Sequence, residues 1–145
     1  MQVRHILIGK GRDVVAIASN ATLCDAAKLL TDRGIGALVV MDGNGALTGI
    51  ISERDLVQAV ANGGVAALSE KVSDHMASQP KTCTEADTVE ILMDVMTRGR
   101  FRHVPVLDQD MRLCGMISIG DVVKTRIAET VSEAAALRDY ISTAV

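Results

Sequence analysis

Two serine–aspartate pairs in this chain have the side chains and spacing to bind a sugar diol. Ser52 is followed three residues later by Asp55, and Ser118 is followed in the same way by Asp121. An aspartate at the start of a helix can accept two hydrogen bonds from the vicinal hydroxyls of a ribose. A serine there can bond a ribose or phosphate oxygen, and a helix N-terminus favours an anion. The same spacing also forms a capping box, in which the two side chains satisfy free helix amides. The two interpretations are compatible, and both stay open.

The other reactive side chains do not form a recognisable catalytic centre or metal site. His5, His75 and His103 are scattered, and no pair of them has the i,i+4 spacing of helical metal ligands. No Ser–His–Asp or Cys–His order can be assigned, so we expect no activated nucleophile and no catalysis. The three cysteines are widely spaced and make no CxxC pair. This usage favours a reduced, cytoplasmic chain with buried thiols.

The composition excludes several classes of function. Of the 145 residues 48% are hydrophobic but only 1% aromatic, which argues against a stacking platform for single-stranded nucleic acid. Fifteen Lys and Arg residues stand against 18 Asp and Glu, a net charge of −3, so we expect no nucleic-acid partner. No segment approaches the roughly 18 uninterrupted apolar residues of a membrane helix, and the N-terminus does not resemble a signal peptide.

The chain contains one unit twice. Residues 42–57 align without a gap with residues 108–123 at an offset of 66, and eight of the eighteen pairs from Val40/Val106 to Val57/Val123 are identical. Each copy spans roughly 55 to 60 residues, which is too few to bury a good core alone. The two copies must therefore pack together, and that packing places a ligand-sized crevice at their seam.

Hydrophobic periodicity predicts the same β-α-β-β-α order in both copies. In copy one we expect strands over 14–18, 37–41 and 47–51, a helix from the Thr22 cap to Gly34, and a second helix from 53 to about 61. The turn 42–45 predicts a tight hairpin. Copy two repeats this order from 81 to about 127, short helices over 3–7 and 72–76 lead into the copies, and a C-terminal helix covers 131–141. We place the first repeat at 8–66, the second at 74–132 and the C-terminal helix at 133–145.

The copies differ most just before their second strands. Copy two has Arg102 and His103 there, and copy one has Gly36 and Ala37. The basic pair could bind a ligand, or it could belong to the solvated basic edge RGRFRHV. Two further glycines, Gly49 and Gly115, precede the serine–aspartate pairs and leave room for backbone or a ligand to approach closely.

The doubled pattern resembles a tandem cystathionine-β-synthase (CBS) domain pair. The matching strings are GIGALVVMDGNGALTGIISERDLV and RFRHVPVLDQDMRLCGMISIGDVV, with VSDHM before the second. The resemblance covers nearly the whole chain. It implies an α/β fold of two β-α-β-β-α repeats packed as a pseudo-twofold pair. It further implies binding of adenosine-containing ligands such as AMP, ADP, ATP, NAD(H) or S-adenosylmethionine in clefts between the repeats, and dimers shaped as a flat disc. With no catalytic or membrane domain attached, the chain is similar to stand-alone members.

The resemblance also assigns the fuller of two sites. In the family, a basic pair contacts the ligand phosphate and the small pair opposite lets the purine lie against backbone. The residues implied are Ser118, Asp121, Arg102 and His103 of copy two with Gly36 and Ala37 of copy one. Lys10, Gly11 and Val14 are carried over because the segment entering the first strand lies beside the family's adenosine pocket. A flexible connecting loop is the alternative for that segment.

A second, unequal site would use Ser52, Arg54 and Asp55 with backbone near Phe101. Arg54 could reach a phosphate, or it could be an exposed arginine in the first helical turn. Ile119 and Gly120 replace Glu53 and Arg54 in copy two, so the sites cannot be equivalent.

The expected function is that of a non-catalytic regulatory module. It would bind AMP, ATP or NAD(H) between the repeats and signal to an unknown regulated protein by a conformational or dimer rearrangement. Two alternatives remain: a dimeric interaction scaffold with vestigial sites, and an enzyme, such as a weak hydrolase, acting on the bound nucleotide. We expect a cytoplasmic homodimer with no membrane partner.

Overall fold

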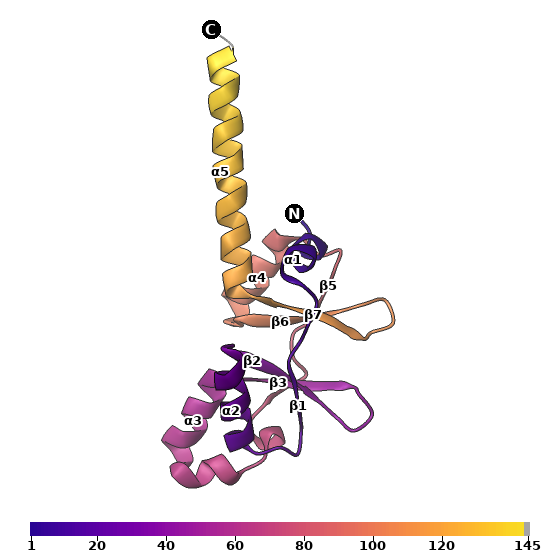
Figure 1. Ribbon diagram of the computed structural model, residues 1–145, viewed down its shortest axis with the longest axis vertical. Helices are drawn as coiled ribbons and strands as arrows, with labels where there is room; N and C mark the ends of the chain where they lie inside the picture. Colours follow the sequence, from indigo (N-terminus) through magenta and orange to yellow (C-terminus); the bar gives the residue numbers. More distant parts are fainter. Residues whose placement is uncertain (144–145) are drawn as a thin grey trace.

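Each repeat folds around its own small sheet. The computed structural model describes residues 1–143, and its two sheets have the strand orders β1-β2-β3-β4 and β5-β6-β7. Figure 1 shows the two repeats stacked along the long axis, with one helix projecting from the end of repeat two. The fold is therefore an α/β tandem of two repeats. The elements of repeat one are β1 (Ala16–Ala18), α2 (Leu23–Arg33), β2 (Ala37–Met41), β3 (Leu47–Ser52) and α3 (Glu53–Gly63).

Repeat two has the same order of elements, at the offset found in the sequence. Its elements are β5 (Cys83–Thr84), α4 (Val89–Gly99), β6 (His103–Leu107), β7 (Leu113–Ser118) and α5 (Ile119–Thr143). In both sheets the first strand is parallel to the second, and the second and third form an antiparallel hairpin. Val40 lies opposite Gly49 in the first hairpin, and Val106 lies opposite Gly115 in the second. The predicted hairpins and their equivalence are confirmed.

Local capping explains why the helices begin and end where they do. The Thr22 hydroxyl accepts a hydrogen bond from the Asp25 amide at 3.1 Å, and Thr88 accepts one from Ile91 at 3.2 Å. Gly34 ends α2 in the left-handed conformation, with φ of 62°, which a residue without a Cβ adopts at little cost. The predicted start and end of α2 are thereby confirmed.

The structure corrects three of the predicted elements. The second helix of repeat two and the separate C-terminal helix over 131–141 are one continuous helix, α5, because residues 128–130 contain no glycine or proline to interrupt it. The strand expected over 14–18 begins only at Ala16. The segment 72–76 forms a short 3₁₀ turn, η2 (Val72–Asp74), and then strand β4 (Ala77–Ser78). Of the predicted C-terminal helix 133–145, residues 144–145 lie outside the described residues.

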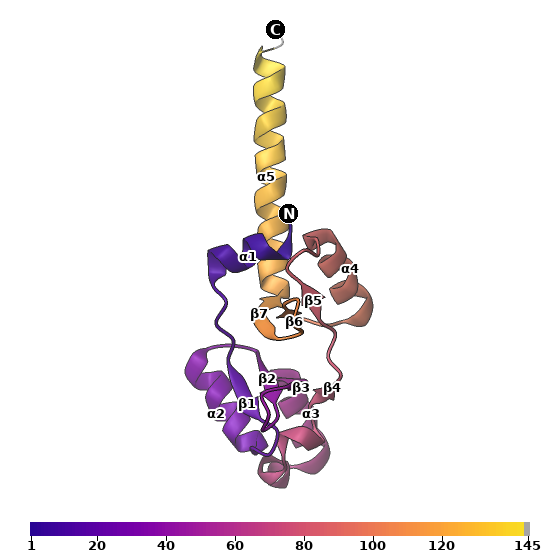
Figure 2. The same ribbon diagram turned by 90° about the vertical axis from the view of Figure 1, so that its right-hand side faces the viewer.

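The two segments that lead into the repeats exchange places. Helix α1 (Val3–Lys10) precedes repeat one but packs on repeat two, and Figure 2 shows it beside β5 and β7 with the chain then descending to β1. Val3, Ile6 and Leu7 belong to the core of repeat two. The linker η1 (Val65–Ser69) and η2 belong to repeat one, where Val72 is fully buried. Each repeat therefore completes the core of the other.

Main-chain hydrogen bonds hold both exchanged segments in equivalent ways. The Val3 amide donates to the Asp87 carbonyl at 2.9 Å, and the Val72 amide donates to the Ala21 carbonyl at 2.8 Å. Isolated β-bridges join Gln2 to Thr88 and Thr22 to Lys71. The two crossings are thus related by the same pseudo-symmetry as the repeats themselves.

The close approach expected at Gly49 and Gly115 is made by these exchanged segments. A Cβ on Gly115 would lie 2.7 Å from a methyl carbon of Leu7, and one on Gly49 would lie 2.6 Å from the Met76 sulfur. A side chain at either glycine would therefore push the incoming segment off the sheet. Of the helices formed by residues 1–143, none is both long enough and apolar enough to cross a bilayer.

We predict that replacing Leu7 by alanine destabilises the whole protein. Leu7 is 1% exposed in the core of repeat two, so the cavity left there should lower the free energy of unfolding by about 2 to 5 kcal/mol. The matched control is Ile8→Ala, because Ile8 is the next residue of α1 and is 73% exposed. It should change the free energy by no more than about 0.5 kcal/mol. Urea unfolding measures both, and equal effects would contradict the exchange.

Candidate functional site

A cleft lies at the seam and is lined by both repeats. Its volume is about 260 Å³, close to the lower end of the roughly 300 to 1,000 Å³ typical of small-molecule sites. The start of β2, the start of β6 and the end of β7 meet there, because the two sheets face each other across the seam. The lining residues are Lys10, Asp13, Val14, Val15, Ile35, Gly36, Ala37, His103, Met116 and Ser118.

The cleft gathers half of the residues predicted for the two sites. Six of the twelve line it, namely Lys10, Val14, Gly36, Ala37, His103 and Ser118. Three others of the fuller site, Arg102, Gly11 and Asp121, lie outside the lining. Arg102 has an exposed side chain, while its carbonyl accepts a hydrogen bond from the Ile119 amide at 2.8 Å. Gly11 is exposed just after α1, with φ of 100°.

Asp121 adjoins the cleft and forms a capping box with Ser118. Its Oδ2 accepts from the Ser118 amide at 2.8 Å, and its own amide donates to Ser118 Oγ at 3.2 Å. The same Oδ2 also accepts a hydrogen bond from Lys10 Nζ at 2.7 Å, and Lys10 donates to the Met116 carbonyl at 2.9 Å. The predicted cap is therefore present. The lysine is an additional partner that the repeat pattern did not indicate.

The surroundings of Asp121 keep it ionised. Burial alone would raise its pKa, but the hydrogen bonds from Lys10 and Ser118 and the lysine charge together lower it below the usual 3.8. A negative charge at the first turn of α5 also interacts favourably with the helix dipole. The site therefore offers a fixed carboxylate acceptor at neutral pH.

His103 faces the backbone of the other repeat. A Cβ on Gly36 would lie 3.4 Å from His103 Cε1, so the ring lies against the place where a side chain is absent. Burial lowers the pKa of His103 from 6.5, and the Arg102 charge lowers it further. The imidazole is therefore neutral at pH 7 and can donate or accept one hydrogen bond. Of the basic pair, His103 therefore meets the small residues of the other repeat at the seam, whereas Arg102 lies outside the lining.

The second predicted site is arranged differently. Ser52 and Asp55 form the same capping box, with the Ser52 amide donating to Asp55 Oδ2 at 2.8 Å. Asp55 lines a separate cleft of about 370 Å³ with Glu70, Asp74 and His75. Ser52 and Arg54 line neither of these two clefts, and Arg54 is exposed.

The exchanged segments explain why the two sites differ. Lys10 is the last residue of α1, the segment that crosses to repeat two, and it reaches Asp121 there. Asp121 thus has a lysine partner from the exchanged segment, whereas among residues 1–143 the side chain of Asp55 is hydrogen-bonded only within its capping box with Ser52.

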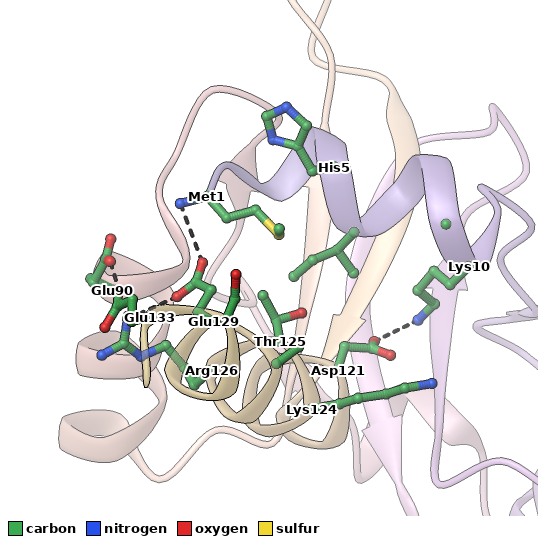
Figure 3. A pocket seen from close by; sticks show the side chains of 14 residues that line it. Met1, His5, Lys10, Glu90, Asp121, Lys124, Thr125, Arg126, Glu129 and Glu133 are labelled. Carbon is green, nitrogen blue, oxygen red and sulfur yellow. Dashed lines mark hydrogen bonds and ion pairs between the residues drawn. The ribbon is translucent and has the colours of Figure 1, made fainter. Parts of the chain in front are cut away.

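A larger cleft lies between α1, α4 and the base of α5 and has a volume of about 770 Å³ (Figure 3). Lys10 and Asp121 stand at one end of it, and ion pairs stand at the other. Arg126 pairs with Glu129 at 2.9 Å and with Glu90 at 3.3 Å. The pair with Glu90 joins α5 to α4, and the pair with Glu129 lies within α5. Among residues 1–143, no group of three or more His, Cys, Asp or Glu side chains could hold a metal ion.

Comparisons with known proteins agree with the repeat structure. Residues 3–62 and 72–128 each match the family described as CBS domain. The mitochondrial CBS domain-containing protein CBSX3 of Arabidopsis thaliana is 40% identical over 124 residues, which cover 83% of this chain and 60% of that protein. The crystal structure of the CBS-domain containing protein ATU1752 from Agrobacterium tumefaciens has a TM-score of 0.85 and 48% identity, covering 87% of this chain and 99% of that one.

Two similar structures contain adenosine compounds. The CBS domain protein PAE2072 from Pyrobaculum aerophilum, complexed with AMP, is 27% identical with a TM-score of 0.75, over 83% of this chain and 89% of that one. The CBS domain pair of protein MJ0100, in complex with 5-methylthioadenosine and S-adenosyl-L-methionine, is 25% identical with a TM-score of 0.79, over 89% and 98%.

We predict that the ion pair between Lys10 and Asp121 stabilises the fold only where Asp121 is ionised. Because the folded pKa of Asp121 lies below 3.8, the stabilisation is fully present above that value and is lost as pH falls through the folded pKa. Lys10→Met should therefore be less stable than the parent at pH 6, and the difference should shrink toward pH 2. Urea unfolding across this range measures it.

The control for this series is Lys81→Met, which removes an exposed lysine away from the cleft. The difference in unfolding free energy between Lys81→Met and the parent should be the same at pH 6 and at pH 2. A stability loss for Lys10→Met that is the same at every pH would contradict the role given to Asp121.

Proposed function

This chain belongs to the CBS domain family, and on that premise we propose that it is a non-catalytic regulatory module that binds an adenine nucleotide at the seam of its repeats. The observation that carries the proposal is the shared cleft, in which Gly36 and Ala37 of one repeat face His103 and Ser118 of the other. A ligand there would contact both repeats at once. Its binding energy would therefore depend on how the repeats are arranged, which is what a sensor requires.

Each part of a nucleotide has a matching group at this seam. The purine would lie against the backbone of Gly36 and Ala37, where no long side chain stands in the way. The Asp121 carboxylate would accept hydrogen bonds from the ribose hydroxyls. Arg102, exposed at the edge, and Lys10 would supply charge to the phosphate, and charge-assisted bonds of this kind are roughly twice as strong as neutral ones.

The contact between Lys10 and Asp121 connects binding to the rest of the molecule. A ribose that donates hydrogen bonds to Asp121 competes with Lys10, and a phosphate nearby offers the lysine another partner. Lys10 ends α1, which forms part of the core of repeat two, and Asp121 begins α5. Nucleotide binding would therefore change how α1 and α5 are held, and a partner protein could detect that change.

The AMP, 5-methylthioadenosine and S-adenosyl-L-methionine bound by similar proteins support the adenosine part of the ligand. We extend the proposal to ATP and NAD(H), which contain the same adenosine. We also propose a reducing compartment, the cytoplasm, because Cys24, Cys83 and Cys114 are free thiols. Burial raises the pKa of Cys83 to about 12, which makes this thiol unreactive.

A dimeric scaffold with vestigial sites is the second candidate. It is favoured by one observation, that the capping boxes of Asp55 and Asp121 are complete without any ligand. Under that account both aspartates have only a structural role.

We predict that Asp121→Ala weakens AMP binding by roughly 2 to 4 kcal/mol, because two hydrogen bonds to a charged acceptor are lost. Arg102→Ala should weaken AMP more than adenosine, since only AMP has a phosphate. Calorimetric titration of each variant with AMP and adenosine measures these differences, and GMP should bind the parent more weakly than AMP.

The matched control is Asp55→Ala, which removes the same cap from repeat one. Each alanine variant should cost about 0.5 to 2 kcal/mol of folding stability. Asp55→Ala should leave the tighter site intact. If Asp121→Ala binds AMP as the parent does, Asp121 has only the capping role and the scaffold is the better account.

We further predict that the protein is a homodimer in solution. Large apolar side chains stand exposed on three helices of the body: Val57 on α3 is 69% exposed, Ile91 on α4 53% and Val123 on α5 44%. A symmetric interface would cover them. Light scattering at micromolar concentration should give twice the chain mass of 15.3 kDa. A mass near that of one chain, with and without AMP, would contradict this prediction.

A further inference from the structure

The second half of α5 extends beyond the body of the molecule. Figures 1 and 2 both show it projecting past α1 and α4, and every residue from Thr130 to Thr143 is exposed. Of the helix's residues, Val122 near its start is the buried one. Helices of fewer than roughly 12 to 15 residues are marginal in water without packing. The projecting part therefore needs a packing partner if it is to remain helical.

Five apolar residues of α5, together with Thr130, follow the spacing of a coiled coil. Their separations are four, three, four, three and four residues, which places them on one seam of the helix. These residues are Val123, Ile127, Thr130, Ala134, Leu137 and Ile141. Ile127, Leu137 and Ile141 are 59%, 61% and 58% exposed. At about 100° per residue the seam is turned roughly a quarter of the way around the helix from Val122, so it lies beside the body and stays uncovered.

The charges beside this seam select one kind of partner. With Ile127, Ala134 and Ile141 at the a positions of the heptad, Glu133 takes a g position and Arg138 the next e position. In a parallel pair of α5 helices, Glu133 of each copy lies next to Arg138 of the other. In an antiparallel pair, g faces g and e faces e, which brings Glu133 toward Glu133 and Arg138 toward Lys124. Opposite charges therefore meet only in the parallel arrangement.

We propose that α5 forms a parallel two-stranded coiled coil with α5 of a second copy of this chain. The small side chains of Thr130 and Ala134 let the two helices approach closely at the middle of the seam. The symmetry axis then runs along α5, parallel to the long axis of the molecule (Figure 1). Such an axis places repeat one of one copy beside repeat one of the other, and repeat two beside repeat two.

Exposed apolar side chains on the body of the molecule are consistent with that axis. Figure 1 shows α3 and α5 on the same side of the molecule. Val57 on α3 and Val123 on α5 occupy equivalent places in the two repeats, and both are exposed. A second copy related by this axis would approach both side chains. This pairing goes beyond the proposed nucleotide site and does not depend on it.

Disulfide trapping in the full-length protein tests the pairing directly. In a parallel coiled coil the two a positions face each other, so Ala134→Cys should form a dimer on a non-reducing gel under mild oxidation. The matched control is Ala135→Cys, one residue further and on the outer face. We expect a several-fold higher yield of cross-linked dimer for Ala134→Cys than for Ala135→Cys. The parent should give no cross-linked dimer, and this control excludes a contribution from its three native cysteines. Equal yields for the two variants, or no cross-link at Ala134→Cys, would overturn the proposal even if light scattering finds a dimer.

Charge reversal provides an independent test that leaves the helix intact. Glu133→Arg or Arg138→Glu alone places two like charges next to each other, and the symmetry of the pair repeats this contact on both sides of the coiled coil. Each should raise the dimer dissociation constant roughly tenfold, measured by analytical ultracentrifugation. The double variant should restore the parent value. A double variant as weak as the single variants, or single variants that bind as the parent does, would contradict the parallel pairing.

Discussion

The exchange of the two lead-in segments is the constraint on which the rest of the structure depends. Leu7 packs where Gly115 has no Cβ, and Met76 packs where Gly49 has none. Each small repeat thereby obtains apolar residues that it could not supply from its own elements. Because both cores contain a segment that belongs to the other side, the repeats cannot separate without opening both. The seam between them is consequently a fixed part of the fold.

That fixed seam explains the position and the inequality of the candidate sites. Helix α1 completes the core of repeat two with Val3, Ile6 and Leu7, and it ends at Lys10. The same helix therefore provides both the core side chains and the cation that pairs with Asp121. Lys10 reaches Asp121, while the side chain of Asp55, in the described part of the chain, is hydrogen-bonded only to Ser52 of its own capping box. Together with His103 against Gly36, this makes the seam beside repeat two the site with carboxylate, imidazole and cation in one place.

Much of this arrangement could be predicted from the sequence, and the remainder could not for physical reasons. The repeat, the hairpins and the caps at Thr22 and Gly34 depend on residues close together in the chain, so local sequence patterns predict them. The exchange depends on which of two similar cores a short helix enters, and apolar spacing does not distinguish them. The ion pair of Lys10 and Asp121 joins residues far apart in the chain, so no local pattern indicates it. The continuity of α5 did have a signal, the lack of glycine or proline over 128–130.

Hydrogen–deuterium exchange with and without AMP shows whether one nucleotide is held by both repeats at the seam. We expect exchange to slow at the same AMP concentration for amides at the start of β2, near Gly36 and Ala37, and for amides at the end of β7, near Ser118. These segments belong to different repeats and lie on opposite sides of the cleft. Protection confined to one repeat, or no protection at saturating AMP, would contradict the account.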